Sequence, residues 1–256
     1  MSNVVITSTI GRPELRQCIE SVRSQTEAAR HMVYVNGPQY HAAARAILRD
    51  YPDVTAFYLN DETGDYGSGG SMADVFAGAP FLTRADWIFY LDDDNFFDSD
   101  HVASLMNLAR ENDLKWAYSL RRFVSQEGNA ICDDDFRSLG HWPVVGTDGH
   151  LVDNSCYAVS RRLAQRMSLA WTALPLVADR CFFMALERSG ERYGCTGLST
   201  VNYRIGTGSA QETPEHYLNL KDSVQGRYPG GFPWRKPRVF GTGTWMTESH
   251  LHAVVP

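Results

Sequence analysis

Three consecutive aspartates, Asp92 to Asp94, are the residues best suited to chemistry, because they directly follow the apolar run WIFYL at residues 87–91. A continuous bulky run of this kind is typical of a central strand buried on both faces. Ligands of open parallel sheets bind beyond the carboxyl ends of the strands, so the run would bring the three acids to the ligand-binding edge. Carboxylates a few ångströms apart repel each other unless a cation lies between or beside them. The pattern therefore predicts a site for a hard divalent metal, Mg²⁺ or Mn²⁺, completed by water and by the phosphate oxygens of a nucleotide.

A second triplet, Asp133 to Asp135 in CDDDF, has the same acids without the apolar lead-in. Glycine and charged residues flank it, and Arg137 is near enough in sequence to pair with it, so we interpret it as a solvated turn. Two other roles stay open for Asp92 to Asp94. They could cap the helix that follows, although Asp98 and Ser99 are better placed to do so. They could also belong to a calcium loop, although the glycine at position six and the glutamate at position twelve are missing.

The glycine-rich loop GDYGSGGS, residues 64–71, is the second candidate for ligand contact. Its glycines, Gly67 and Gly69 among them, let the backbone approach a ligand closely. A helix beginning near Ser71 would direct N–H groups at phosphate oxygens. The loop does not follow the first strand and its spacing is wrong for a GxGxxG dinucleotide fingerprint. A surface loop without ligand contact is the alternative.

Asp179 is the third candidate, in the predicted helix VADRCFFMALE. Phe182, Phe183 and Leu186 follow it at i+3, i+4 and i+7, so the acid is in line with an apolar stripe. A carboxylate in this position is either paired, with Arg180 or another basic residue, or held at a cleft where it can do chemistry. Both interpretations remain open from the spacing alone.

The elements that must position these residues alternate between strand and helix patterns. NVVITST at residues 3–9 is a β-branched strand, and the helix after it is opened by Pro13, with apolar residues at i, i+3, i+4 and i+7 from Leu15. The alternation predicts an α/β fold with a parallel sheet covered by helices. The C-terminal region is rich in Gly, Pro and aromatic residues and shows little periodicity. Further elements are expected as strands over 31–36, 54–60, 86–91, 115–124 and 128–134, and as helices over 39–50, 99–112 and 176–190.

Composition excludes several classes of protein. The 256 residues carry 43% hydrophobic residues and a net charge of -6, and the basic residues are scattered, so we expect a folded domain that does not bind nucleic acid. Five cysteines without a CxxC pair argue against a disulfide framework or a zinc site and favour the cytoplasm. No run reaches the roughly 18 to 20 apolar residues that span a bilayer, so any membrane contact would be peripheral.

Several segments together resemble the inverting GT-A glycosyltransferases of family 2, in particular the spore-coat polysaccharide type. The similar pieces occur in the family's order: VVITSTIGRPELRQCIESVRSQT, WIFYLDDDN, LVDNSCYAVSRRLAQ at residues 151–165, and DRCFF. The resemblance implies a GT-A fold, a Rossmann-like and mostly parallel central sheet flanked by helices. It also implies one continuous domain, with a nucleotide-sugar-binding half over 1–120 and an acceptor-binding half over 121–256 that ends in a lid or tail.

The resemblance implies roles for individual residues. The hydroxyls of Thr7, Ser8 and Thr9 would lie at the edge of the nucleotide base and Asp93 at the ribose. Asp94 would be the main ligand of Mn²⁺ or Mg²⁺, supported by Asp92. Asp179 would deprotonate the acceptor hydroxyl, which His150 and Asp153 would face. Trp142 is interpreted either as a platform for the acceptor sugar or as core.

The sequence departs from the family pattern at two places. Asn36 and Gly37 occupy the position after the second strand where the family usually has a base-reading aspartate. SMAD at residues 71–74 replaces the family's Ala-Arg-Asn run before the Asp-x-Asp strand. We therefore expect the basic contact to the diphosphate from elsewhere, with Arg227 in GRYPGGFPWRKPR (residues 226–238) as the candidate. That segment would either close over the donor as a lid or wrap around the domain.

The resulting hypothesis is a metal-dependent inverting glycosyltransferase. It would move a sugar from a nucleoside diphosphate sugar, expected to be a UDP-sugar, to a hydroxyl of a saccharide, a lipid-linked acceptor or a small molecule. A sugar nucleotidyltransferase is the first alternative, but it needs a glycine-rich loop with a basic residue after the first strand, and TSTIGRP offers only one glycine and Arg12. A non-catalytic carbohydrate-binding protein with a degenerate site is the second alternative. The sequence leaves the oligomeric state open.

Overall fold

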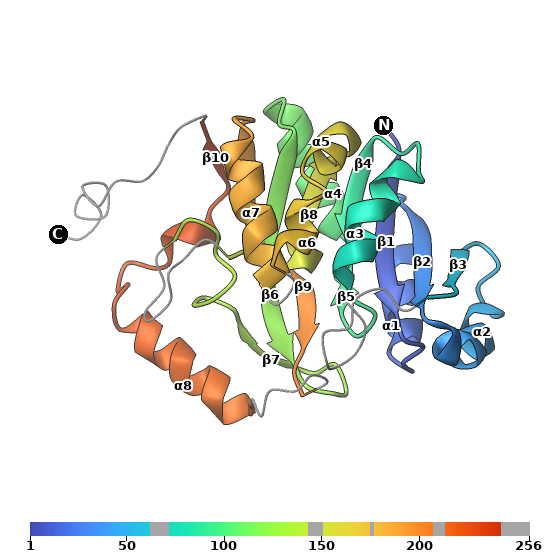
Figure 1. The fold of residues 1–256 in the computed structure, drawn as a ribbon. Coiled ribbons are helices and arrows are strands. Elements are labelled where there is room, and N and C mark those ends of the chain that lie inside the picture. The colour runs from blue at the N-terminus through green and yellow to red at the C-terminus, as the bar shows by residue number, and fades with distance from the viewer. Residues whose placement is uncertain (62–71, 143–150, 175–176, 207–212, 242–256) are drawn as a thin grey trace.

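The computed structural model describes residues 1–61, 72–142, 151–174, 177–206 and 213–241 (Figure 1). The strands are β1 (Asn3–Thr9), β2 (Arg30–Asn36), β3 (Thr55–Leu59), β4 (Trp87–Tyr90), β5 (Phe96–Phe97), β6 (Trp116–Val124), β7 (Ala130–Asp133), β8 (Tyr157–Ser160), β9 (Tyr193–Arg204) and β10 (Arg238–Phe240). They form one ten-stranded sheet with the order β10-β9-β6-β8-β4-β1-β2-β3, while β5 pairs with β9 and β7 with β6 off this path.

Six strands of the main path run in the same direction. β4, β1, β2 and β3 are mutually parallel neighbours. β8 lies between β4 and β6 and is antiparallel to both, so β6 points the same way as β4, and β9 is parallel to β6. The carboxyl ends of β1, β2, β4 and β6 therefore meet at one edge of the sheet. In Figure 1 this is the lower edge, and the amino terminus of β1 is at the top.

The helices are α1 (Leu15–Arg23), α2 (His41–Leu48), α3 (Met72–Gly78), α4 (His101–Glu111), α5 (Arg161–Arg166), α6 (Ala170–Ala173), α7 (Ala178–Arg188) and α8 (Pro214–Gln225). Short 3-10 turns are η1 (Pro38–Tyr40), η2 (Ala79–Phe81), η3 (Asn154–Cys156) and η5 (Pro233–Arg235). Figure 1 shows α3, α6 and α7 side by side on one face of the sheet. α8 lies apart from them and packs on β7.

Amphipathic spacing explains why these helices cover the sheet. The apolar residues of α1 at Leu15, Cys18, Ile19 and Val22 are all buried. On α7 the expected stripe at Phe182, Phe183 and Leu186 is buried in the same way. Phe182 stacks on Trp171 of α6, with ring centroids 4.1 Å apart, so aromatic packing fixes the start of α7 against the sheet.

The alternating first part of the sequence is predicted correctly from β1 through α4, except for the two-residue strand β5. The patterns also do not predict β8, α5, α6, β9, α8 or β10. β9 is interrupted by Gly194 and by Gly197, whose φ of 72° breaks the regular alternation of a strand. The proposed boundary at residue 120 falls inside β6, and the sheet continues through it.

Two further findings concern membrane-spanning helices and the state of the cysteines. In the part of the chain described, we find no helix that is both long and apolar enough to cross a membrane. The five cysteines are all free thiols, and four of them are buried.

Candidate active site

The three aspartates lie at the carboxyl end of β4, where the sequence places them. The backbone N–H of Leu91 still donates to Ile6 O, at 3.0 Å, so the chain stays aligned with β1 up to the acids. The chain then leaves the extended conformation and turns, since the backbone N–H of Asn95 donates to Asp92 O at 3.2 Å. Asp92 and Asp94 are partly exposed, whereas Asp93 is buried.

Asp93 binds the loop that follows β1. Its Oδ2 accepts hydrogen bonds from the Thr9 hydroxyl at 2.6 Å and from the backbone N–H of Ile10 at 3.2 Å. Burial raises the pKa of Asp93 to about 6, and the neighbouring charge of Asp94 adds to this, while Arg12 and the two hydrogen bonds oppose it. Asp93 thus joins β4 to the β1–α1 loop.

Asp94 faces a cation from the same loop. Arg12 Nη1 lies 2.5 Å from Asp94 Oδ2 and 3.9 Å from Asp93 Oδ1. The loop reaches this position through Gly11, whose φ is 77°, and a Cβ there would come within 2.9 Å of Ala44 N. Arg204 holds the other side of the turn, because its Nε donates to Asp94 O at 2.9 Å.

Asp92 faces the second half of the sheet. Its Oδ1 accepts from the side-chain amide of Asn154 at 2.6 Å, and its Oδ2 is 3.4 Å from Asn95 Nδ2. Burial raises the pKa of Asp92 well above its usual value, and the charges of Asp153, Asp94 and Asp179 add to this. Several carboxylates therefore lie close to Asp92, and their mutual repulsion is the condition under which the sequence predicts a bound cation.

Asp179 lies in the first turn of α7, close enough for its charge to raise the pKa of Asp92. Its Oδ1 is buried with no hydrogen-bond partner among the described residues. Burial raises the pKa of Asp179 to about 8, and Asp153 adds to this, while Arg121 and a hydrogen bond with the Asn154 backbone oppose it. Asn154 thus contacts Asp92 with its side chain and Asp179 with its backbone.

A buried arginine on β6 corrects the interpretation of the second acid triplet. Arg121 Nε donates to Asp134 Oδ2 at 2.7 Å, and its Nη1 forms a short ion pair with Asp153. Asp134 is fully buried and also accepts backbone N–H groups, including that of Arg137 at 2.8 Å. Asp135 is buried as well and pairs with Arg235 Nε at 2.7 Å. The solvated turn predicted for CDDDF is therefore wrong, since its acids neutralise distant arginines that sequence proximity does not reveal.

A cavity of about 420 Å³ opens beside Asp179. Its walls come from β6, β9, the starts of α3 and α7 and the segments between them, and they combine charged with apolar side chains. The lining residues are Met72, Arg121, Arg137, Leu151, Asp153, Val177, Ala178, Asp179, Arg180 and Tyr203. This space is suited to a polar organic molecule next to a carboxylate.

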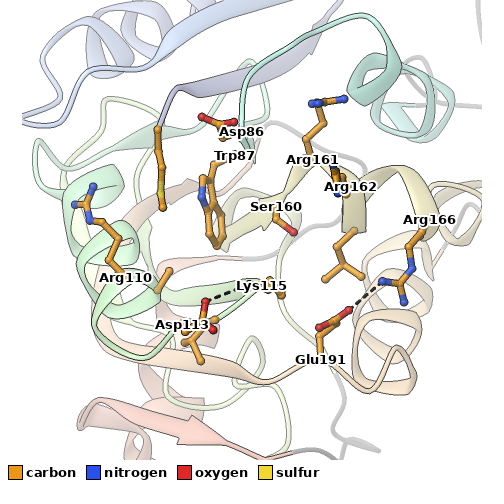
Figure 2. A pocket seen from close by; sticks show the side chains of 14 residues that line it. Asp86, Trp87, Arg110, Asp113, Lys115, Ser160, Arg161, Arg162, Arg166 and Glu191 are labelled. Carbon is orange, nitrogen blue, oxygen red and sulfur yellow. Dashed lines mark hydrogen bonds and ion pairs between the residues drawn. The ribbon is translucent and has the colours of Figure 1, made fainter.

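A larger cavity of about 860 Å³ lies at the opposite edge, where β4 and β6 begin (Figure 2). Two ion pairs lie among its charged side chains: Lys115 Nζ is 3.1 Å from Asp113, and Arg166 is 2.9 Å from Glu191. Because ligands of parallel sheets bind at the carboxyl edge, we assign the active site to the smaller cavity and to the acids after β4.

The residues predicted to contact the donor, other than the three aspartates, differ in their surroundings. Thr7 turns its hydroxyl into the core, 2.9 Å from His31 Nε2, so it does not reach the ligand edge. Ser8 is partly exposed, and Asn36 is buried at the end of β2. Gly67 and Gly69 lie outside the described residues. Among the predicted hydroxyls, Thr9 is the one joined to the aspartates.

The predicted acceptor contacts also divide. Trp142 is only 4% exposed and packs on Trp234 with centroids 5.9 Å apart, so it is a core residue and the sugar-platform interpretation is wrong. Asp153 lines the cavity but its carboxylate is engaged by Arg121. His150 lies outside the described residues. Arg227 is exposed just after α8, which packs on β7, and it is Arg12 that contacts the acids.

Sequence reasoning missed four residues that organise the site: Arg12 as an acid partner, Arg121, Asn154 and Arg204. Arg12 could have been predicted as a partner of the acids, because it directly follows Gly11 in the loop after the first strand. Asn154 belongs to the LVDNSCY segment, but nothing in its spacing indicates that it reaches Asp92, 62 residues away.

The acids can be tested for their fit to a divalent metal. Among the described residues no group of three or more His, Cys, Asp or Glu side chains is arranged to hold a metal ion. Asp92 and Asp94 offer hard carboxylate oxygens in one turn, and after burial the charges of Asp153, Asp94 and Asp179 raise the pKa of Asp92, a repulsion that a cation would relieve. Mg²⁺ typically takes only one or two carboxylates and completes its shell with water and phosphate. The two acids fit that mode of binding once Arg12 moves off Asp94.

Comparison with solved structures defines the class of fold. S. aureus TarS 1-349 matches with a TM-score of 0.60 at 10% identity, covering 90% of this chain and 72% of that chain. The same protein in complex with UDP-GlcNAc matches with a TM-score of 0.59 at 12% identity, covering 88% and 65%. At this identity the likeness shows the fold alone, and it confirms the predicted single α/β domain of the GT-A type.

The family follows from the sequence of the first half. Residues 3–144 of 256, more than half of the chain, match the family described as Glycosyl transferase family 2. The chain belongs to glycosyl transferase family 2. An uncharacterized protein of Haemophilus influenzae is 37% identical over 71 residues, which are 28% of this chain and 47% of the relative. The match thus spans about half of that relative's length.

Proposed function

We propose that this protein transfers a sugar from a UDP-sugar to an acceptor hydroxyl with inversion at the anomeric carbon. The observation that carries the proposal is the convergence of Asp94 and Asp179 on Asp92 at the carboxyl edge of the sheet, where Asn154 contacts both Asp92 and Asp179. Membership of glycosyl transferase family 2 supports the reaction class. The TarS structures in complex with UDP-GlcNAc and with UDP support the choice of donor.

In this proposal the donor lies over the ends of β1 and β4. Asp93 and Thr9 keep the β1–α1 loop in place beside it. Asp94 and Asp92 would hold Mn²⁺ or Mg²⁺, which when bound supplies positive charge to the departing diphosphate. Arg12, released from Asp94, is a second cation within reach of phosphate oxygens.

Asp179 is the proposed general base. Its carboxylate accepts the proton of the acceptor hydroxyl while that oxygen attacks the anomeric carbon on the face opposite the diphosphate. One bond to the anomeric carbon forms as the bond to the diphosphate oxygen breaks, so the configuration inverts. A pKa of about 8 gives the base enough affinity for the proton while leaving part of the population ionised near neutral pH.

Two variants separate binding from transfer. Asp94→Ala should abolish the Mn²⁺-dependent increase in melting temperature produced by UDP. Asp179→Asn should keep that increase and lose transfer by about two to four orders of magnitude, measured with a panel of UDP-sugars. Nearly full turnover of Asp179→Asn would refute the base assignment.

Two analyses of the reaction products test the rest of the proposal. Retention of configuration in the product would refute inversion, and release of pyrophosphate from a nucleoside triphosphate would indicate a nucleotidyltransferase instead.

The spore-coat polysaccharide subtype and the cytoplasmic location are proposals that rest on the sequence alone.

A further inference from the structure

The cavity beside Asp179 is rich in arginine. Arg121 on β6, Arg137 in the loop after β7 and Arg180 on α7 all line it, so three separate elements bring a guanidinium group to one space. Leu151 and Val177 add apolar wall. This combination differs from the donor edge, where the acids dominate.

The three arginines have different roles. Arg121 is buried, and its charge is met by Asp134 and Asp153, so it serves the structure of the wall. Arg137 and Arg180 are only partly buried, so solvent reaches both. Their backbones are fixed, because the N–H of Arg137 donates to the buried Asp134 and Arg180 belongs to the first turn of α7. Arg137 is also placed with its guanidinium 5.5 Å from the ring centre of Tyr217.

Guanidinium groups form paired, charge-assisted hydrogen bonds with carboxylate and phosphate oxygens, and they are preferred where such groups must be oriented. Arg180 is adjacent in sequence to Asp179, so an anion bound to it lies within one small molecule's length of the proposed base. We propose that the acceptor carries a phosphate or carboxylate group close to the reacting hydroxyl, and that Arg137 and Arg180 bind this group. The inference rests on the proposed function, because it takes the cavity as the acceptor site.

The donor diphosphate is the competing occupant of these arginines. The donor-side acids Asp93 and Asp94 already have a cation, Arg12, from the β1–α1 loop. Asn154 contacts Asp92 with its side chain and Asp179 with its backbone, and the lining of the arginine cavity includes Asp179 but neither Asp92 nor Asp94. The two occupants predict different effects on UDP affinity, so binding measurements distinguish them.

The experiment uses the full chain, first saturated with UDP and Mn²⁺ and then titrated with three matched probes: glycerol 3-phosphate, glycerate and glycerol. We expect at least one anionic probe to bind about tenfold or more tightly than glycerol. Arg137→Gln and Arg180→Gln should each weaken that binding by about fivefold or more, with the UDP dissociation constant changed by less than about twofold. The stronger of the two anionic probes identifies phosphate or carboxylate as the group.

Arg162→Gln is the matched control, because Arg162 is an exposed arginine that lines the opposite cavity of Figure 2. It should leave the binding of both anionic probes unchanged. Arg180→Lys keeps the charge without the planar fork and should give an intermediate affinity. Unfolding curves of all variants identify any that fail to fold, and the conclusion then rests on the remaining arginine.

Three results would overturn the inference: equal binding of glycerol and the anions, no anion binding while UDP binds, or arginine variants that weaken UDP instead of the anion. Failure of UDP itself to bind would count against the proposed function. The probe series repeated without UDP would then still decide whether the cavity is an anion site.

Discussion

Asp92, Asp93 and Asp94 are chemically identical and adjacent, yet each carboxylate has different partners. Asp93 turns inward to Thr9, Asp94 faces Arg12, and Asp92 faces Asn154. Asp179 completes the set from 85 positions further along the chain than Asp94. The raised pKa values of Asp92, Asp93 and Asp179 show that the folded protein holds these acids in an environment that disfavours their charge.

Asp179 should lower the stability of the protein at neutral and basic pH. Its folded pKa of about 8 exceeds the value of about 3.9 in an unfolded chain. Between about pH 4 and pH 8, the folded state therefore keeps a proton on Asp179 that the unfolded chain has lost. The contribution of this group to stability is full below about pH 4 and is lost as pH rises toward 8. In metal-free buffer Asp179→Asn should raise the free energy of unfolding by about 1–3 kcal/mol at pH 8 and by nearly nothing at pH 4.

Denaturant unfolding of wild type and variant across that pH range measures the difference. Asp113→Asn is the control, because the Asp113 side chain is 89% exposed, and its effect should not depend on pH in this way. A gain for Asp179→Asn that is equal at pH 4 and pH 8 would contradict the raised pKa.

Arg12 should compete with the metal for Asp94. With Nη1 at 2.5 Å from Asp94 Oδ2, the guanidinium must move before a cation binds there. Removing its charge should therefore raise the affinity for Mn²⁺ without nucleotide, by about three- to tenfold for Arg12→Gln. Titration calorimetry in EDTA-treated buffer measures this. Arg16→Gln is the control, since Arg16 pairs with Asp50 on the surface. Unchanged or weaker Mn²⁺ binding by Arg12→Gln would show that Asp94 is not a metal ligand.

At the scale of elements, η3 and β6 connect the two halves of the site. Asn154 begins η3 and contacts both Asp92 and Asp179, so the relative position of β4 and α7 depends on this short turn. Asp153 caps the turn by accepting the N–H of Ser155 at 2.9 Å. Arg121 of β6 in turn binds Asp153 and ties it to Asp134.

Removing Arg121 should therefore damage the fold more than a surface charge would. Arg121→Met leaves Asp134 and Asp153 buried without their cation, which typically costs about 3–5 kcal/mol. Arg166→Gln breaks the exposed pair with Glu191 and should cost less than about 1 kcal/mol. Denaturant midpoints compare the two. A cost below 1 kcal/mol for Arg121→Met would show that the buried acids find other partners or become protonated.

At the scale of the whole molecule, residues 226–240 pack onto the second half of the sheet. Trp234 of η5 is 2% exposed, and its Nε1 donates to Asp135 at 2.6 Å, while β10 adds an antiparallel strand to β9. The segment 226–238 is therefore anchored through Trp234 and Arg235, which supports the wrapping alternative over a freely closing lid. Asp135, which follows β7, is thus bound by two residues about 100 positions further along the chain.

Trp234 should contribute to stability through both packing and its hydrogen bond. Trp234→Ala should lower the free energy of unfolding by about 3–5 kcal/mol because it leaves a cavity beside Trp142. Trp234→Phe keeps most of the packing and should cost only about 1–2 kcal/mol for the lost bond to Asp135. UDP affinity should stay unchanged in Trp234→Phe, because the acids that we propose to hold the donor follow β4. A cost below 1 kcal/mol for Trp234→Ala would mean that the segment is not anchored.

The sequence by itself determined the first half of the fold and the place of the acids. A buried apolar strand delivers its end to the ligand edge, and regular alternation of strand and helix patterns marks β1 through α4. These signals are local, since the residues that produce each pattern are close in the chain. The same locality explains the errors. CDDDF was interpreted from its neighbours, while its partners Arg121 and Arg235 lie 13 and 100 residues from the acids they bind.

Only the tertiary structure decided what each acid does. The turn after β4 buries Asp93 and leaves Asp92 and Asp94 partly exposed, and the partners that give them different surroundings come from β1, the β1–α1 loop, η3 and α7. Asp179 owes its raised pKa to burial and to Asp153, neither of which its helix pattern encodes. Charge and burial act through space at a few ångströms, whereas sequence patterns record only spacing along the chain. The arginine cavity beside Asp179 exists for the same reason, because it forms only when three separate elements come together.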